Sequence, residues 1–247
     1  MKKLTGIMVL AVALLVAFSA YVMSGEEKAA DPAKQEATAA ASETAKETTE
    51  KAPAKAEMQG NAEIPAETGA TINQAAPQFS LTGADGKKYS LSDFAGKWVV
   101  LEWANFDCPF VKKHYGSKNM QSLQKAYTEK GVVWLTICSS APEKQGNFTG
   151  EALMTKIKES GIGSTAYLPD ADGRVGKMYG AKTTPHMFVI NPKGVLVYAG
   201  AIDDKPSTKP EDIEGATNFV KAALESGMKN EVILVASTPS YGCSVKY

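Results

Sequence analysis

Two short apolar runs in the middle of the chain have the length and composition of buried strands: "WVVLEW" at 98–103 and "VVWLTIC" at 132–138. Between them, residues 109–130 carry apolar side chains at helical spacing, in two pieces divided at 116–117, with a helix stop at Gly131. A strand, a helix and a second strand in this order predict two neighbouring parallel strands that are buried in one sheet.

The pattern continues on both sides of this unit. Upstream, "PQFSLTGADGKKYSL" alternates apolar and polar residues around Asp85 and Gly86, which predicts a β-hairpin with a tight turn, and Ser92 is expected to cap a short turn after it. Downstream, the spacing predicts a helix at 151–160, a strand at 165–168, a helix at 175–179, two antiparallel strands at 187–190 and 195–199, and a helix at 216–226. The order predicts an α/β domain with a mixed sheet.

The N-terminus, residues 1–25, has the features of an export signal. Lys2 and Lys3 precede an uncharged apolar run at residues 6–23. The run of about 18 residues is longer than the usual signal core of about 7–15 and near the lower limit of about 17–25 for a membrane span. We therefore expect an exported protein, either cleaved and periplasmic or tethered to the membrane through residues 6–23.

Residues 26–75 are rich in Ala, Glu, Lys and Thr and have no sustained apolar periodicity, so we expect a disordered linker. This linker either tethers a domain near a membrane or serves only as a solubilising tail. The folded domain is predicted at 76–230, followed by a C-terminal tail at 231–247 that contains Cys243.

Charge and composition exclude several classes of function. Lys plus Arg and Asp plus Glu each total 27, so no net field favours nucleic acid. Arg174 is the only arginine, which removes the bidentate clamp that most phosphate and carboxylate sites use. The sequence has no phosphate-binding loop, no dinucleotide fingerprint and no paired carboxylate motif, and we predict no metal or organic cofactor.

Cys108 is the main candidate for chemistry. It lies where the first buried strand meets a helix, and Pro109 is favoured in a first helical turn. Free N–H groups and the positive end of the helix dipole stabilise a thiolate there, and the thiolate is the nucleophilic form of cysteine. Lys112 and Lys113 are expected to act in the same direction and Asp107 against them. The alternative is a buried, inert cysteine.

Three motifs in this order resemble a known family. They are "NFDCPFVKKHY", "AKTTPHMFVI" and the C-terminal "GCSVKY", together with the upstream hairpin. The chain over residues 76–247 is similar to the thioredoxin fold, and within it to the alkyl hydroperoxide reductase and thiol-specific antioxidant family, in a peroxiredoxin-like branch. The resemblance implies a mixed central sheet flanked by helices, with an N-terminal β-hairpin extension, and a thiol-dependent redox activity.

The resemblance also implies a site. Thr184 and Pro185 are placed as the cis-proline turn that faces the active cysteine in thioredoxin-like folds. His186 follows directly and His114 lies six residues after Cys108, so both histidines of the chain are expected beside the thiolate, where they would handle protons.

Two departures from the family patterns bear on the activity. Thioredoxin-type reductases carry Cys-x-x-Cys, but Val111 stands at the second cysteine position, which excludes dithiol exchange within the motif. Typical peroxiredoxins carry a proline, a Thr or Ser, and a downstream arginine. Here Leu101 and the candidate Asn105 occupy the first two positions and only Arg174 follows, which counts against efficient peroxidase activity.

A second sulfur is available from two places. Cys243 lies in a tail with few apolar residues, and a mobile arm would bring it within the Cα separation of about 7 Å that a disulfide requires. Cys138, at the end of the second buried strand, is the competitor, although a small buried hydrophobic role is the alternative for it.

These observations lead to three hypotheses. The first is an exported thiol oxidoreductase in which Cys108 attacks a peroxide or a disulfide, with Cys243 or an external thiol or thioredoxin-like reductant completing the cycle. The second is a copper-delivery protein that uses Cys108 with His114 or His186, and with Cys138 or Cys243. The third is a catalytically silent thioredoxin-like binding module.

Overall fold

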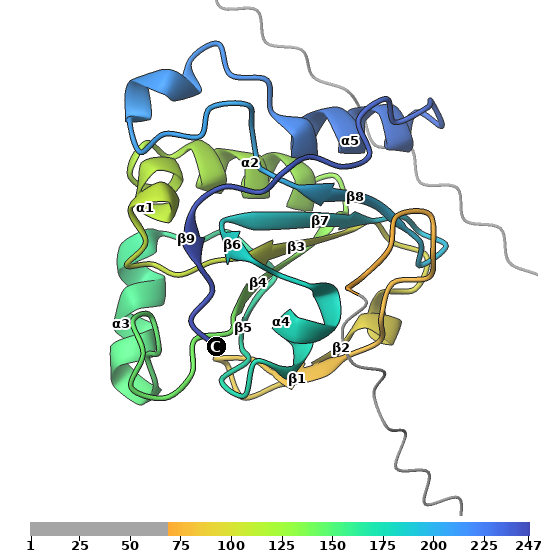
Figure 1. Cartoon of the computed structure of the whole chain (residues 1–247). Helices are drawn as coiled ribbons and strands as arrows, with labels where there is room; N and C mark the ends of the chain where they lie inside the picture. Colours follow the sequence, from red (N-terminus) through yellow and green to blue (C-terminus); the bar gives the residue numbers. More distant parts are fainter. Residues whose placement is uncertain (1–68) are drawn as a thin grey trace, which may run out of the picture. The chain divides into compact units, whose positions relative to one another are not determined.

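The computed structural model describes residues 69–247, and its centre is a five-stranded mixed sheet in the order β5-β4-β3-β7-β8 (Figure 1). Strand β3 runs parallel to β4, β4 runs parallel to β5, and β7 is antiparallel to both β3 and β8. The strands span Val99–Trp103 (β3), Val133–Cys138 (β4), Ala166–Pro169 (β5), His186–Ile190 (β7) and Leu196–Gly200 (β8).

Strands β3 and β4 are buried along their whole length. Successive side chains of a strand point to opposite faces, so Val100 enters one apolar cluster while Leu101 enters the other. Such continuous apolar runs are typical of parallel strands that are covered on both faces, which confirms the prediction from the two runs.

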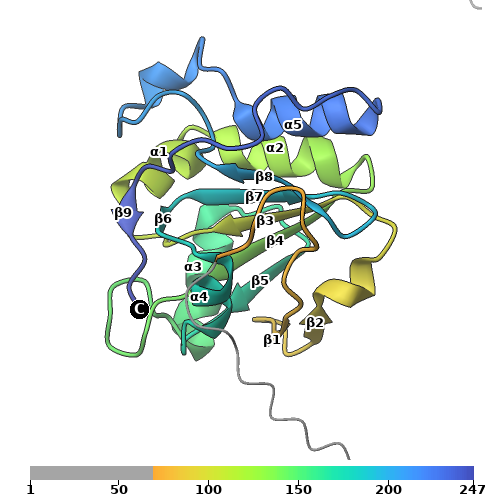
Figure 2. The same cartoon turned by 45° about the vertical axis from the view of Figure 1, so that its right-hand side comes forward.

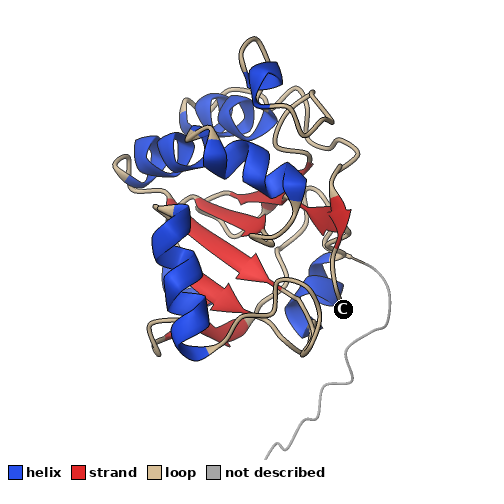
Figure 3. Cartoon of the chain, turned by 90° about the vertical axis from the view of Figure 1, so that its left-hand side faces the viewer, coloured by secondary structure: helices blue, strands red, loops and turns tan. Residues whose placement is uncertain are grey.

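Helices cover both faces of the sheet (Figures 2 and 3). Side chains of α1, α2 and α5 pack into one cluster, whereas α4 and the N-terminal hairpin contribute to the other. The break predicted at 116–117 is confirmed, because Lys118, with φ at 64°, separates α1 from α2. The helices span Pro109–Gly116 (α1), Asn119–Thr128 (α2), Gly150–Ser160 (α3), Arg174–Tyr179 (α4) and Phe219–Met228 (α5).

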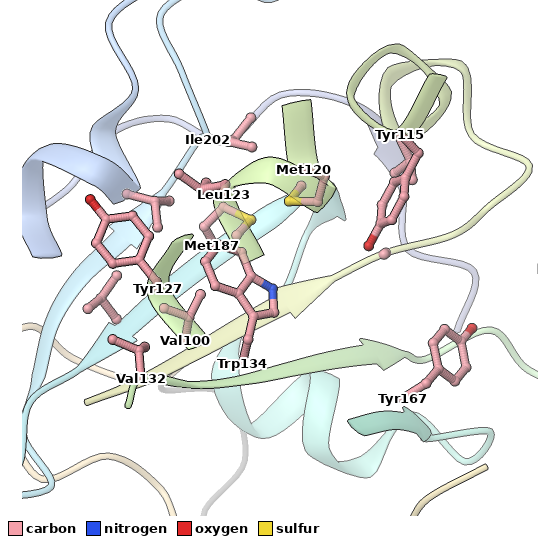
Figure 4. Packing of buried hydrophobic residues seen from close by; sticks show 14 of the residues in the cluster. Val100, Tyr115, Met120, Leu123, Tyr127, Val132, Trp134, Tyr167, Met187 and Ile202 are labelled. Carbon is pink, nitrogen blue, oxygen red and sulfur yellow. The ribbon is translucent and has the colours of Figure 1, made fainter. Parts of the chain in front are cut away.

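The larger cluster centres on Trp134 of β4 (Figure 4). Met120, Leu123 and Tyr127 of α2 pack over the sheet there at the i, i+3, i+7 spacing of one helix face. This packing fixes α2, and through the short α1–α2 connection it fixes the helix that begins directly after Cys108.

The N-terminal part begins earlier than predicted. Backbone hydrogen bonds join Asn73 to Leu196 and Ala76 to Gly194, so the ordered part includes residues before the predicted boundary at Ala76. The short turn after the hairpin is preceded by Ser90 instead of Ser92. The amide of Ser90 donates to the Asp93 carboxylate, 2.8 Å away. The hairpin consists of β1 (Ser80–Thr82) and β2 (Lys88–Ser90), and the turn is the 3-10 helix η1 (Leu91–Phe94).

The sheet order and the helices on its two faces form the thioredoxin-like fold that the sequence predicts. Helix α5 begins three residues later than expected. Three short elements were not predicted: β6 (Thr183–Thr184), the 3-10 helix η2 (Pro210–Ile213) and β9 (Cys243–Ser244). Strands β6 and β9 pair with each other, and this pair forms the site described below.

The export signal and most of the predicted linker lie outside the described residues. Within 69–247, no helix is both long enough and apolar enough to span a membrane.

Glu102, in the middle of β3, is a carboxyl group buried in this core. Its oxygens accept hydrogen bonds from Tyr115, Gln124, Trp134 and Thr136. Burial raises the pKa of Glu102, and these four donors offset only part of that effect. The folded protein therefore binds a proton at Glu102 more readily than the unfolded chain does.

This raised pKa makes stability depend on pH. The contribution of Glu102 is fully present below its unfolded pKa and is lost as pH rises through the folded pKa. We expect Glu102→Gln, which cannot ionise, to remove this loss, so that the variant gains in unfolding free energy relative to wild type between about pH 4 and about pH 8. Denaturant unfolding of both proteins at about pH 4 and at about pH 8 measures this difference in unfolding free energy. An unchanged difference would contradict the assignment.

Candidate active site

Cys108 is the residue that precedes the first turn of α1, with Pro109 in that turn as predicted, and its side chain is fully buried. Asn105 shapes the loop that leads to it. The Asn105 carbonyl accepts from the Cys108 amide, its side-chain oxygen accepts from the Asp107 amide, and its side-chain nitrogen donates to the carbonyl of Gln145. Asn105 thus positions the loop, and these bonds do not direct its side chain to the sulfur.

The turn at Thr184 and Pro185 faces Cys108, and their peptide bond is cis, as expected. The Cys108 thiol donates to the Thr184 carbonyl at 3.1 Å. The Thr184 hydroxyl is buried and makes no hydrogen bond to any of the described residues. It is therefore available to donate to the sulfur when Cys108 is a thiolate.

The C-terminal segment is docked on the domain, where the sequence led us to expect a mobile arm. We call residues 236–247 the C-terminal strap. It runs past α1 to β6 (Figure 1), where Cys243 pairs with Thr184 in the β6–β9 ladder. Backbone hydrogen bonds also join Thr238 to Ala199 and Val245 to Lys182. The pairing places Cys243 beside Cys108.

The two sulfurs have opposite acidities. Burial alone would raise the pKa of Cys108, but hydrogen bonding from the Cys243 thiol and the Thr184 side chain, with the amides of Val111 and Cys243, outweighs burial and lowers that pKa. Burial together with the Cys108 charge raises the pKa of Cys243 to about 11. Cys108 is thus the more acidic thiol of the pair and Cys243 the less acidic one.

The predicted influence of the lysine pair is not found. Lys112 is exposed, and Lys113 turns away to donate to the carbonyl of Lys205, at 2.8 Å. Neither is among the groups that shift the pKa of Cys108. The helix N-terminus does act as expected, through the amide of Val111.

Cys138 does not join this site. The Cys138 side chain is buried. Its thiol lies within hydrogen-bonding distance of the Ser140 hydroxyl, at 3.4 Å, and of the Gly146 carbonyl, at 3.5 Å. The contacts of Cys138 are those of a packed core cysteine.

The two histidines also have other partners. His186 accepts from the Lys182 amide and packs on Phe188 at 4.5 Å, while His114 contacts Asn119 and Tyr241. Burial lowers the pKa of each histidine to about 4, so both are neutral near pH 7. No hydrogen bond joins either ring to Cys108, and the expected proton-handling arrangement is not formed.

A largely buried polar cluster that was not predicted from the sequence joins α1 to the strap. We call Lys113, His114, Asp203 and Tyr241 the Tyr241 cluster. Two of its members lie in the first motif and Tyr241 lies in the strap, two residues before Cys243. The first motif therefore contacts the residue directly before the C-terminal motif, and only this contact reveals the role of Asp203.

The described part of the chain has no preformed metal site. No group of three or more His, Cys, Asp and Glu residues within 69–247 is arranged to hold an ion.

Comparison with known proteins identifies the family. Residues 72–199, more than half of the chain, match the model of the AhpC/TSA family. The chain belongs to the AhpC/TSA family. Its curated relatives include the thiol-disulfide oxidoreductase ResA of Bacillus thuringiensis subsp. konkukian, which is 29% identical over 127 residues that cover 51% of this chain and 67% of ResA. The thioredoxin-like protein YneN of Bacillus subtilis is 27% identical over 151 residues, which cover 60% of this chain and 83% of YneN.

Two solved structures share the fold of this AhpC/TSA protein. A hypothetical protein of Sinorhizobium meliloti 1021 is 27% identical with a TM-score of 0.63, and the match covers 73% of this chain and 96% of that one. An uncharacterized conserved protein of Geobacillus kaustophilus is 27% identical with a TM-score of 0.62, over 72% of this chain and 92% of that one.

The β6–β9 pairing requires a glycine at 242. Its φ is 133°, and a Cβ there would lie 2.1 Å from the Thr184 carbonyl oxygen. We expect Gly242→Ala to undock Cys243, because strain of about 1–3 kcal/mol adds to the steric conflict. Native-state labelling by a maleimide, followed by mass spectrometry, should show Cys108 modified several-fold faster than in wild type.

Gly86→Ala is the matched control, since Gly86 also has a positive φ, 79°, but open space at its Cβ position. Equal labelling of Cys108 in Gly242→Ala and in the control would contradict the close approach at Gly242.

Proposed function

We propose that this AhpC/TSA protein is a thiol–disulfide oxidoreductase that works through a Cys108–Cys243 redox pair. The observation that carries the proposal is the meeting of the two cysteines: Cys108 with a lowered pKa at the start of α1, and Cys243 held beside it by the β6–β9 ladder. The ResA relatives, named as thiol-disulfide oxidoreductases, support the same reaction class.

Cys108 is the nucleophile in this proposal because it is the better thiolate. Its sulfur attacks one sulfur of a substrate disulfide, R–S–S–R′, to form Cys108–S–S–R and release R′–S⁻. The Thr184 hydroxyl stabilises the Cys108 thiolate before attack. Because Cys108 is fully buried with the strap docked, the substrate meets the sulfur when the strap has moved.

Cys243 then completes the exchange. Its sulfur attacks Cys108, forms the Cys108–Cys243 disulfide and releases R–S⁻. Burial raises the pKa of Cys243 first, and the Cys108 charge raises it further. Once Cys108 is in a mixed disulfide its charge is gone, so the second cause disappears at the step where Cys243 must lose its proton. An external thiol or thioredoxin-like reductant would return the pair to the dithiol.

Peroxide is the second candidate substrate. Its attack by Cys108 would give a sulfenic acid and water, and Cys243 would condense with that sulfenic acid to the same disulfide. The donors that typical peroxiredoxins direct at peroxide are not assembled here, since Asn105 binds its own loop and Gln145, and Arg174 is exposed on α4. The geometry therefore favours disulfide over peroxide.

The remaining hypotheses have less support. Copper delivery would need Cys108 with a histidine, and the hydrogen bonds of His114 and His186 all go to other groups. A silent binding module would not need the lowered pKa of Cys108. Export, by cleavage or by a membrane tether through residues 6–23, remains part of the proposal on the strength of the sequence pattern alone.

Cysteine variants test the pair. With glutathione disulfide as substrate, we expect Cys108→Ser to abolish turnover, whereas Cys243→Ser should accumulate a stable mixed disulfide at Cys108. Cys138→Ser is the control and should retain activity, because its thiol is engaged elsewhere. Mass spectrometry of the trapped species identifies the sulfur. Turnover by Cys108→Ser, or no Cys108–Cys243 disulfide in the oxidised wild type, would overturn the proposal.

A parallel arm tests peroxide. We expect hydrogen peroxide to oxidise Cys108 at a rate ordinary for a thiolate, because no arginine is placed to polarise the peroxide. A sulfenic-acid trap measures the product in Cys243→Ser. A rate several orders of magnitude above that of a small-molecule thiolate would instead make peroxide the preferred substrate.

A further inference from the structure

Tyr241 connects the strap to α1 through contacts with an aromatic ring and a charged group. Its ring lies 5.8 Å from the Phe110 ring, and the Lys113 ammonium lies 5.7 Å from its centroid. Both partners belong to α1, the helix that begins directly after Cys108. The contact therefore joins the helix that presents one cysteine to the segment that carries the other.

The Tyr241 hydroxyl is held from two sides. It donates to the Asp203 carboxylate, and His114 lies 3.3 Å away through Nε2. The His114 Nδ1 is 2.8 Å from the Asn119 side-chain nitrogen, which donates to it. The neutral ring then carries its proton on Nε2 and donates that proton to the Tyr241 oxygen. Each hydrogen bond of this arrangement therefore has a defined donor and a defined acceptor.

Asp203 is itself fixed. It lies 3.8 Å from the Lys113 ammonium, and the two side chains are 2% and 0% exposed. The Lys205 amide donates to the same oxygen that accepts from Tyr241. A buried ion pair of this kind has little rotational freedom, so the acceptor for Tyr241 has a defined position in the folded domain.

Tyr241 lies two residues before Cys243, and Gly242 between them has no side chain to interfere with the Thr184 carbonyl. An anchor at Tyr241 therefore leaves only one residue of freedom before the β6–β9 ladder. We propose that Tyr241 is a positioning residue for the redox pair: its hydroxyl, held by Asp203 and His114, keeps Cys243 against Cys108. The inference rests on the proposed function and adds the residue that sets the properties of the pair.

Two consequences follow from this arrangement. The tendency of two thiols to form a disulfide depends on how often they meet, which is their effective concentration. Releasing Tyr241 lowers this effective concentration and makes the disulfide easier to reduce. Releasing Tyr241 also removes the Cys243 donor from the Cys108 thiolate, so Cys108 becomes a weaker acid.

The test is Tyr241→Phe, which keeps the ring against Phe110 and removes only the hydroxyl. A hydrogen bond to a charged group is worth enough to shift the docked equilibrium about tenfold. Equilibration in glutathione buffers should therefore move the reduction potential of the pair by about 30 mV to less negative values. In a Cys138→Ser background, the pH midpoint of Cys108 alkylation by iodoacetamide should also rise.

Tyr179→Phe is the matched control. It removes a buried tyrosine hydroxyl that bonds to the carbonyl of Pro77, a residue outside the strap. Both variants lose a tyrosine hydroxyl with its hydrogen bonding and some unfolding free energy, but only Tyr241→Phe should change the potential and the midpoint. Wild-type values for both in Tyr241→Phe, or equal shifts in the control, would overturn the inference.

The outcomes also separate the inference from the proposed function. Failure of the wild type to form a Cys108–Cys243 disulfide would overturn the proposed redox pair. The alkylation midpoint would still show whether Tyr241 places Cys243 beside Cys108, because that readout needs no disulfide.

Discussion

The pairing of β9 with β6 is the interaction on which the chemistry of this protein depends. It places the Cys243 thiol and amide beside the buried Cys108. Burial on its own favours the neutral thiol, so the lowered pKa of Cys108 requires hydrogen-bond donors, and the pairing supplies the thiol and the amide of Cys243 among them. Without this two-residue ladder, Cys108 would retain the Thr184 turn and the Val111 amide but lose its partner sulfur.

A buried ion pair between Lys113 and Asp203 helps to hold the strap. Its main effect is to orient the acceptor of Tyr241. The attraction between Lys113 and Asp203 is largely offset by the cost of removing both from water, so such a pair adds little net stability. It does give Tyr241 a fixed acceptor. The same lysine that the sequence assigned to thiolate activation therefore acts on the cysteine pair at a distance, through the position of the strap.

This arrangement replaces the adjacent cysteine of a Cys-x-x-Cys motif with one from the end of the chain. A second sulfur on the same helix turn is always close, whereas a sulfur on a docked segment is close only while the segment stays docked. In the proposed function, the strap therefore also controls access, since Cys108 is fully buried while the strap is docked. The proposed catalytic cycle uses both positions.

The sequence by itself determined the order and nearly all the boundaries of the long helices and strands, because apolar periodicity is local and each run of β3, β4 or α2 carries its own signal. It also placed Cys108 at a helix start, since the strand end and Pro109 are its neighbours, and the family resemblance located the cis-proline turn. Only the tertiary structure decided the partner of each polar side chain. Strands β6 and β9 are too short to show a period, and the directions of Lys113 and His114 depend on Asp203 and Tyr241, which are remote in the chain. Secondary structure follows from neighbours in sequence, whereas the site forms from contacts that exist only after the chain has folded.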